Sequence, residues 1–173
     1  MIGDPAVKVL VLGIGNLLIG DEGVGCKAAD EISRRYLLPP SVECVDGGTA
    51  GFELLSMIDN KEHVILIDAL RNDMEPGTVV MVEDEHVPQA FMARTTPHQL
   101  GICDVLAAAQ LCDTMPKHLT LYGIEPKQLE VGIGLSPEVE AGMEKTISAV
   151  VDQLRHFGYE VKRNGSNGIK SEH

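Results

Sequence analysis

The chain has 173 residues, so it fits a single domain that buries about 70% of the surface its unfolded form exposes. Its formal net charge of -12, the absence of Trp and the lack of any basic cluster longer than a pair exclude nucleic acid and anionic membranes as good partners. No signal-peptide pattern opens the sequence, and no apolar run reaches the roughly 20 residues that cross a bilayer. We therefore expect a cytoplasmic protein.

Short aliphatic and β-branched runs alternate with helical patterns along the first half of the chain. Runs typical of strands buried on both faces occur at residues 8–12, 42–45, 64–67, 78–82 and 119–124. Helical patterns at residues 22–36 and 51–58 separate the first three runs, and this order predicts a mostly parallel sheet. The turn-rich connection at residues 71–77 is too short for a helical crossover, so the fourth strand is predicted to be antiparallel.

Two further helices are predicted in the second half. One spans residues 96–111 and carries His98 in its first turn. The other begins after Ser136 as N-cap, with Pro137 at the first helical position. Its apolar residues recur at three- and four-residue spacing as far as Phe157, so one face packs on the sheet.

These elements predict an α/β fold: a single three-layer domain with a twisted, mostly parallel five-stranded sheet and helices on both faces. We place the domain at residues 1–161. Residues 162–173 are polar and rich in glycine and asparagine, and they are predicted to form a disordered tail.

Four cysteines occur in the sequence without any C-x-x-C spacing. They are Cys26, Cys44, Cys103 and Cys112. Two of them sit in apolar stretches, so we expect buried reduced thiols and keep a zinc site as the less favoured alternative.

A glycine pair follows the first predicted strand, at Gly13 and Gly15. Glycines at this place let a backbone approach a dinucleotide pyrophosphate, but the third glycine of that motif is replaced by Leu18 and Asp46 comes too late to bind a ribose. A tight turn explains the pair as well as a ligand does.

Acidic residues follow three successive elements at the predicted carboxyl edge of the sheet. Glu22 lies in a glycine-rich segment at the start of the first helix, and Asp46 and Asp68 end the second and third strands. Taken singly, Glu22 complements a helix dipole and the aspartates cap turns. Together they matter more, because ligands of open α/β sheets bind outside the carboxyl ends of the strands. Asp68 is the sharper candidate of the two aspartates, since a carboxylate after an unbroken apolar run is costly without a positive partner.

His98 is the histidine best placed to join these carboxylates, although a histidine in this position is more often a surface residue. Glu22, Asp68 and His98 would form an oxygen, oxygen and nitrogen site suited to Ni²⁺ or Zn²⁺, with open coordination positions. Spacing alone does not bring the three together. A shared metal site and separate structural roles therefore both stay open at this point.

Other hydrolytic motifs are missing. The sequence holds no G-x-S-x-G elbow and no H-E-x-x-H helix, and its cysteines lack the electropositive neighbourhood of a nucleophile. These absences weaken the serine, cysteine and zinc-dependent protease interpretations.

Four segments in order make the chain resemble the hydrogenase maturation endopeptidases over residues 7–157. They are Leu10-Val11-Leu12-Gly13-Ile14-Gly15-Asn16-Leu17-Leu18 with Asp21-Glu22-Gly23-Val24-Gly25, Asp46-Gly47-Gly48-Thr49-Ala50-Gly51, Ile67-Asp68-Ala69, and Thr96-Pro97-His98-Gln99-Leu100-Gly101. The resemblance implies a peptidase, sometimes grouped with aspartic peptidases, that removes the C-terminal extension of a nickel-iron hydrogenase large-subunit precursor. It also implies a single α/β domain with a five-stranded sheet.

The resemblance further implies that Glu22, Asp68 and His98 bind nickel. The nickel would belong to the substrate, with zinc or cadmium able to substitute in vitro. Cleavage would follow a His or Arg just after the final C-x-x-C motif of the precursor. Asp46 is our candidate for the catalytic base, oriented through Gly47, Gly48 and Thr49, and a plain turn at a strand end is an equally open role for it.

Two alternatives remain at this stage. The chain could instead be a nickel-dependent checkpoint or chaperone that grips the large subunit without cutting it. The interpretation as a nucleotide-binding module is supported only by Gly13 and Gly15, and it ranks last.

Overall fold

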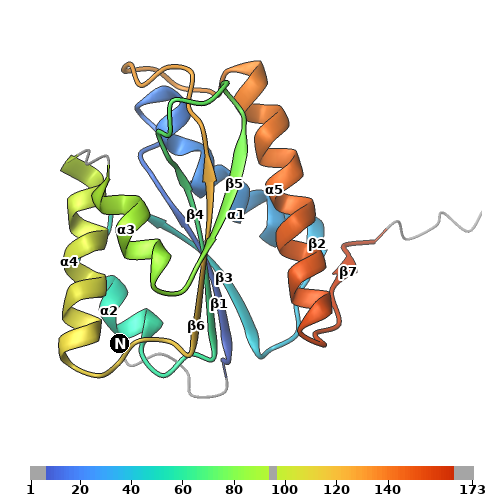
Figure 1. Cartoon of the computed structure of the whole chain (residues 1–173). Coiled ribbons are helices and arrows are strands. Elements are labelled where there is room, and N and C mark those ends of the chain that lie inside the picture. Colours follow the sequence, from blue (N-terminus) through green and yellow to red (C-terminus); the bar gives the residue numbers. More distant parts are fainter. Residues whose placement is uncertain (1–6, 94–96, 166–173) are drawn as a thin grey trace, which may run out of the picture.

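A five-stranded sheet forms the centre of the molecule, in the strand order β3-β1-β4-β6-β5 (Figure 1). The computed structural model describes residues 7–93 and 97–165, with the backbone alone for residues 97–100. The sheet strands are β1 (Val9–Ile14), β3 (Val42–Gly48), β4 (His63–Ala69), β5 (Val79–Glu83) and β6 (His118–Ile124). β1, β3, β4 and β6 are parallel, and β5 is antiparallel to β6 as predicted.

Helices cover both faces of the sheet (Figure 1). They are α1 (Val24–Arg35), α2 (Glu53–Ile58), α3 (His86–Met92), α4 (Pro97–Leu111) and α5 (Pro137–His156), and the 3-10 turn η1 (Gly20–Gly23) precedes α1. α1 and α5 pack on one face, and α2, α3 and α4 pack on the other. The predicted three-layer α/β architecture is therefore confirmed.

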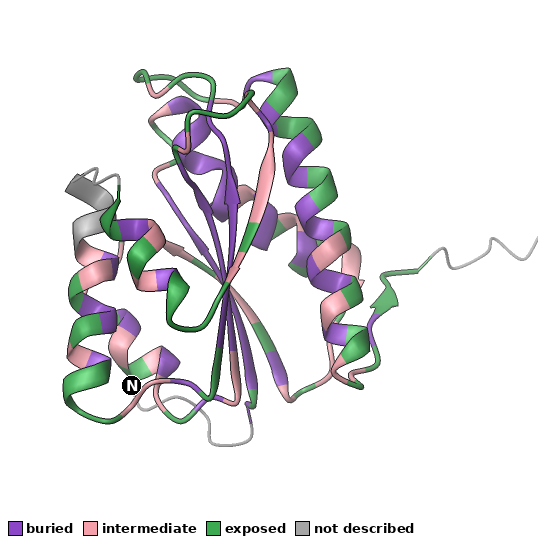
Figure 2. Cartoon of the chain, in the orientation of Figure 1, coloured by how far each residue is buried: buried purple, intermediate pink, exposed green. Residues whose placement is uncertain are grey.

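The core is divided by the sheet into two apolar layers (Figure 2). Along β1, Val9 and Val11 point to the layer under α1 and α5, whereas Leu10, Leu12 and Ile14 point to the layer under α2 and α4. Successive side chains of a strand alternate between faces, so a strand covered on both sides must be apolar at every position. This requirement explains the unbroken aliphatic runs.

The C-terminal boundary predicted at residue 161 is too early. Residues 162–163 form the short strand β7 (Lys162–Arg163), which pairs antiparallel with β2 (Tyr36–Leu37). Just beyond it, the Asn164 amide donates to the Arg35 carbonyl at 2.7 Å. The sequence did not predict this strand, because it is stabilised by pairing with β2 and has no buried apolar face. The rest of the predicted tail, residues 166–173, lies outside the described residues.

Several other details differ from the sequence prediction. The helix α3 was not among the predicted elements. All four cysteines are free thiols, but only Cys26 is buried, and Cys112 is exposed. Within the described part of the chain, we find no helix of the length and apolarity that a membrane span needs.

Candidate functional site

Three of the four candidate residues, Glu22, Asp46 and Asp68, lie at the carboxyl ends of β1, β3 and β4. Gly13 of β1 pairs with Asp46 of β3 on one side and with Ile67 of β4 on the other. Asp46 and Asp68 therefore lie two strands apart at one edge of the sheet, a backbone separation of about 10 Å. Both aspartates lie inside their strands rather than after them, because β3 continues to Gly48 and β4 to Ala69.

Glu22 reaches this edge because glycines let its segment pack directly on the strand ends. A Cβ atom at Gly25 would collide with the carbonyl oxygens of Ile14 and Ile67, and one at Gly15 would collide with the Glu22 carbonyl oxygen. Gly15 also has a φ of 146°, which favours glycine. The space beside Gly15 is thus filled by the backbone of Glu22 itself. The glycine pair serves close packing here, so the nucleotide-binding interpretation loses its one supporting feature.

Asp21 joins the Glu22 turn to the loop between β6 and α5. Its carboxylate is fully buried and accepts hydrogen bonds from the backbone amides of Lys127 at 2.9 Å, Gln128 at 3.0 Å and Ser136 at 2.7 Å. The Ser136 hydroxyl also donates to it, at 2.9 Å. Burial by itself raises the pKa of Asp21, but these hydrogen bonds outweigh burial and the pKa is lowered. Asp21 is therefore held as a carboxylate with fixed geometry.

Sequence reasoning missed this contact. Ser136 does occupy the N-cap position of α5, and Pro137 is the first helical residue, as predicted. Its hydroxyl makes no capping hydrogen bond to the helix, and it donates to Asp21. Nothing in the local sequence near either residue signals a partner so distant along the chain.

Asp46 makes a local turn at the end of β3. Its Oδ1 atom accepts a hydrogen bond from the Gly48 amide at 2.9 Å, and Gly48 has a φ of 54°. The turn role that the sequence left open is thus present, and it leaves the second carboxylate oxygen available for other contacts.

Cys26 is a neighbour of Asp46 that the sequence did not connect with the site. The thiol donates to the Gly15 carbonyl at 3.4 Å. Burial raises the pKa of Cys26 far above its usual range, and the nearby carboxylates of Asp46 and Asp68 raise it further. Cys26 therefore stays a neutral thiol, which is unsuited to act as a nucleophile.

Asp68 is fully buried in the strand next to β1. A buried carboxylate is costly unless hydrogen-bond donors or a cation compensate for the lost water. Glu22 is also buried, and its turn η1 contacts β4, so two acidic side chains enter the protein at the same edge. This arrangement suits a site for a positively charged partner.

His98 lies in the first turn of α4, but its side chain lies outside the described residues. Among the side chains that the structure describes, no group of three or more His, Cys, Asp and Glu residues is placed to hold a metal ion. The trio of Glu22, Asp68 and His98 therefore stays a prediction.

Solved structures of hydrogenase maturation endopeptidases share this architecture. The hydrogenase maturating endopeptidase HybD from Escherichia coli superposes with a TM-score of 0.87 at 43% identity, over 91% of this chain and 98% of that one. The maturation protease HybD from Thermococcus kodakarensis superposes with a TM-score of 0.69 at 27% identity, over 85% and 99% of the two chains.

Sequence comparison agrees with the fold. A family model described as hydrogenase maturation protease matches residues 26–153. The hydrogenase 2 maturation protease of Escherichia coli is 44% identical over 155 residues, which cover 89% of this chain and 94% of that protein. The hydrogenase expression/formation protein HupD of Bradyrhizobium diazoefficiens is 38% identical over 167 residues, covering 95% and 87% of the two chains. The chain belongs to the hydrogenase maturation protease family, and it is a peptidase.

Proposed function

We propose that this protein removes the C-terminal extension of a nickel-iron hydrogenase large-subunit precursor after nickel has been inserted, and that it recognises the nickel itself. Membership of the maturation protease family supports the peptidase activity. The observation that carries the rest is the burial of Glu22 and Asp68 at one edge of the sheet.

In this proposal Glu22, Asp68 and His98 bind open coordination positions of the substrate's nickel. Carboxylates and an imidazole are hard to borderline ligands, and the precursor's own cysteines supply the soft ones. The peptidase then needs no thiolate of its own, which fits the neutral Cys26. Zinc or cadmium would occupy the same donors in vitro, although a free ion would lack the substrate's ligands and bind more weakly.

Asp46 is the group we propose as general base for the attacking water. The Gly48 amide donates to one of its oxygens, which orients the carboxylate for accepting a proton from water. A carboxylate acting on water is also the chemistry of aspartic peptidases, and that classification remains part of the proposal. The cytoplasmic location stays a prediction from the sequence.

The test compares two forms of one precursor. The purified protein is incubated with nickel-loaded and nickel-free large subunit, and the products are weighed by mass spectrometry. We expect the C-terminal extension to be released only from the nickel-loaded form. Equal cleavage of both forms would refute recognition through the metal. Binding of the loaded form without any cleavage would favour the checkpoint or chaperone alternative.

A further inference from the structure

Large apolar side chains are exposed on two loops beside the candidate site. Leu18 is 62% exposed in the loop after β1, and Val131 and Ile133 are 92% and 87% exposed in the loop before α5. Leu17 adds a fourth, partly covered side chain. We call these four residues the apolar rim. Isolated exposed apolar residues are ordinary, but a group of them on adjoining segments marks a binding surface.

The two loops of the apolar rim are tied to each other. The Gly132 amide donates to the Leu18 carbonyl at 2.9 Å, and the Gly20 amide donates to the Gly132 carbonyl at 2.9 Å. The buried Asp21 carboxylate fastens the same two segments through Lys127 and Gln128. The exposed side chains therefore project from a backbone with fixed hydrogen bonds, so little conformational entropy is lost when a partner covers them.

The apolar rim is continuous with the candidate site. Leu17 packs against Gly23, the residue after Glu22: a Cβ atom at Gly23 would lie 3.0 Å from the Leu17 Cα atom and 3.1 Å from its Cδ2 atom. A peptide bond held beside Glu22 would therefore be close to Leu17. Lys127, which precedes the second rim loop, is paired with Glu138 at 2.7 Å. The rim thus offers burial of apolar surface rather than charge.

We propose that the apolar rim binds an apolar segment of the precursor polypeptide that flanks the bond to be cut. This inference rests on the proposed function and adds a second recognition element to it, one that reads side chains rather than the metal. Because the rim and Glu22 share one backbone-bonded unit, binding at the rim aligns the polypeptide with the site.

The experiment uses two matched double variants of the full chain. Leu18→Ser with Ile133→Ser removes the centre of the rim. Leu37→Ser with Leu111→Ser removes two comparably exposed apolar side chains, in β2 and at the end of α4, away from the site. Circular dichroism and thermal unfolding check that both variants fold. Binding to nickel-loaded precursor and the kinetics of its cleavage are measured separately.

We expect the rim variant to bind the precursor at least tenfold more weakly and to show a KM raised by a similar factor, with kcat changed less than twofold. A tenfold loss corresponds to about 1.4 kcal/mol. The control variant should match the unmodified protein. Equal binding by the two variants would overturn the inference. A second outcome would also overturn it. If sedimentation showed that the unmodified protein is a dimer and the rim variant is a monomer, and if the variant had a normal KM, then the rim would bind a second copy of the chain rather than the precursor. Failure of the unmodified protein to cut would refute the proposed function, while the binding comparison would still decide the rim.

Discussion

Asp21 and Ser136 are joined by hydrogen bonds although they lie far apart in the chain. The Ser136 amide donates to Asp21 Oδ1 at 2.7 Å, and the Ser136 hydroxyl reaches the same carboxylate. One partner belongs to the turn η1 before α1, and the other is the N-cap of α5. The contact therefore locks the turn that carries Glu22 to the start of the longest helix.

Replacing Asp21 should destabilise the protein strongly. Asp21→Ala leaves the amides of Lys127, Gln128 and Ser136 without their acceptor, and buried donors without partners cost about 1–3 kcal/mol each, though not additively. We expect a loss of about 3 kcal/mol in the free energy of unfolding, measured by urea denaturation. Ser136→Ala keeps the backbone donor and should cost about 1 kcal/mol. Asp152→Ala, at an exposed site, is the control, and an Asp21→Ala protein as stable as this control would contradict the prediction.

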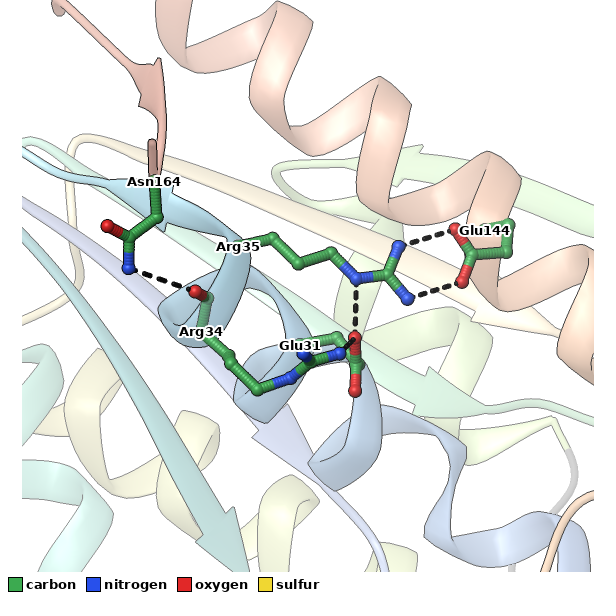
Figure 3. A network of polar contacts seen from close by, with 5 residues as sticks. All are labelled: Glu31, Arg34, Arg35, Glu144 and Asn164. Atoms are coloured by element: carbon green, nitrogen blue, oxygen red, sulfur yellow. Dashed lines mark hydrogen bonds and ion pairs between the residues drawn. The ribbon is translucent and has the colours of Figure 1, made fainter. Parts of the chain in front are cut away.

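An arginine ion pair ties the C-terminal end of α1 to α5 (Figure 3). Arg35 donates to both oxygens of Glu144, at 2.7 and 2.8 Å, and its Nε atom also contacts Glu31. The Arg35 side chain is 29% exposed and that of Glu144 is 52% exposed, so solvent weakens the pair.

Arg35→Ala should lower the free energy of unfolding by about 1 kcal/mol, because a two-pronged pair exceeds an ordinary surface ion pair. Arg35→Lys should recover little of this, since an ammonium cannot form both bonds in the same geometry. The neighbouring Arg34→Ala, at a more exposed arginine, should cost less than about 0.5 kcal/mol. These differences are measured by denaturation at low and high salt. An Arg35 effect that does not shrink at high salt would argue against an electrostatic origin.

The sheet and the acidic residues at its carboxyl edge could both be predicted from the sequence, because both follow from buried parallel strands. β1 and β4 are covered on both faces, so their apolar runs are continuous and their ends are sharp. Parallel strands bring their carboxyl ends to one edge, and this placed Asp46 near Asp68 without any coordinates. The helix at residues 97–111 followed from its proline start and apolar spacing.

Long-range polar contacts could not be predicted in this way. Asp21 looks like an ordinary helix-start acid in the sequence, and only the fold reveals that its partners lie beyond β6. Cys26 likewise gave no sign of its nearness to Asp46, because that approach depends on how α1 packs across β3. The strand β7 was missed since two polar residues carry no periodic signal.

Stability should depend on the ring stack around His63. Its imidazole stacks on His118, with centroids 4.9 Å apart, and on Phe157, at 4.0 Å. Burial lowers the pKa of His63 below its ordinary value, and the neighbouring His118 lowers it further, while Glu62 and Asp84 oppose this more weakly. The folded protein therefore resists protonation of His63 more than the unfolded chain does.

The sign of the pH effect follows from this lowered pKa. Between the unfolded pKa of about 6.5 and the lower folded value, the unfolded chain binds more protons, so stability falls as the pH falls through that window. His63→Phe keeps the stack but cannot titrate, and we expect its stability to fall less between pH 7 and pH 5, measured by urea denaturation at each pH. His156→Gln, whose ring lies outside the stack, is the control. Parallel curves for His63→Phe and the unmodified protein would exclude His63 as the cause.

The last prediction separates the proposed nickel ligands from the proposed base. Asp68→Ala or His98→Ala deletes a metal bond, so both capture of the nickel-loaded precursor and its cleavage should fall. Asp46→Asn keeps an oxygen to accept the Gly48 amide but cannot take a proton from water at neutral pH. It should therefore bind the precursor normally while kcat drops by roughly 10²- to 10⁴-fold, the usual range for general acid-base catalysis.

Binding is measured by capture on immobilised precursor, and cleavage by mass spectrometry of the released extension. Glu53→Gln is the matched control, because it makes the same carboxylate-to-amide change at an exposed position of α2 and should leave both quantities unchanged. Capture without cutting by Asp46→Asn would identify Asp46 as the base. Near-normal cleavage by Asp46→Asn would instead restrict Asp46 to its turn with Gly48, and the water would then have to be activated by the nickel or by Glu22 or Asp68 acting as more than ligands.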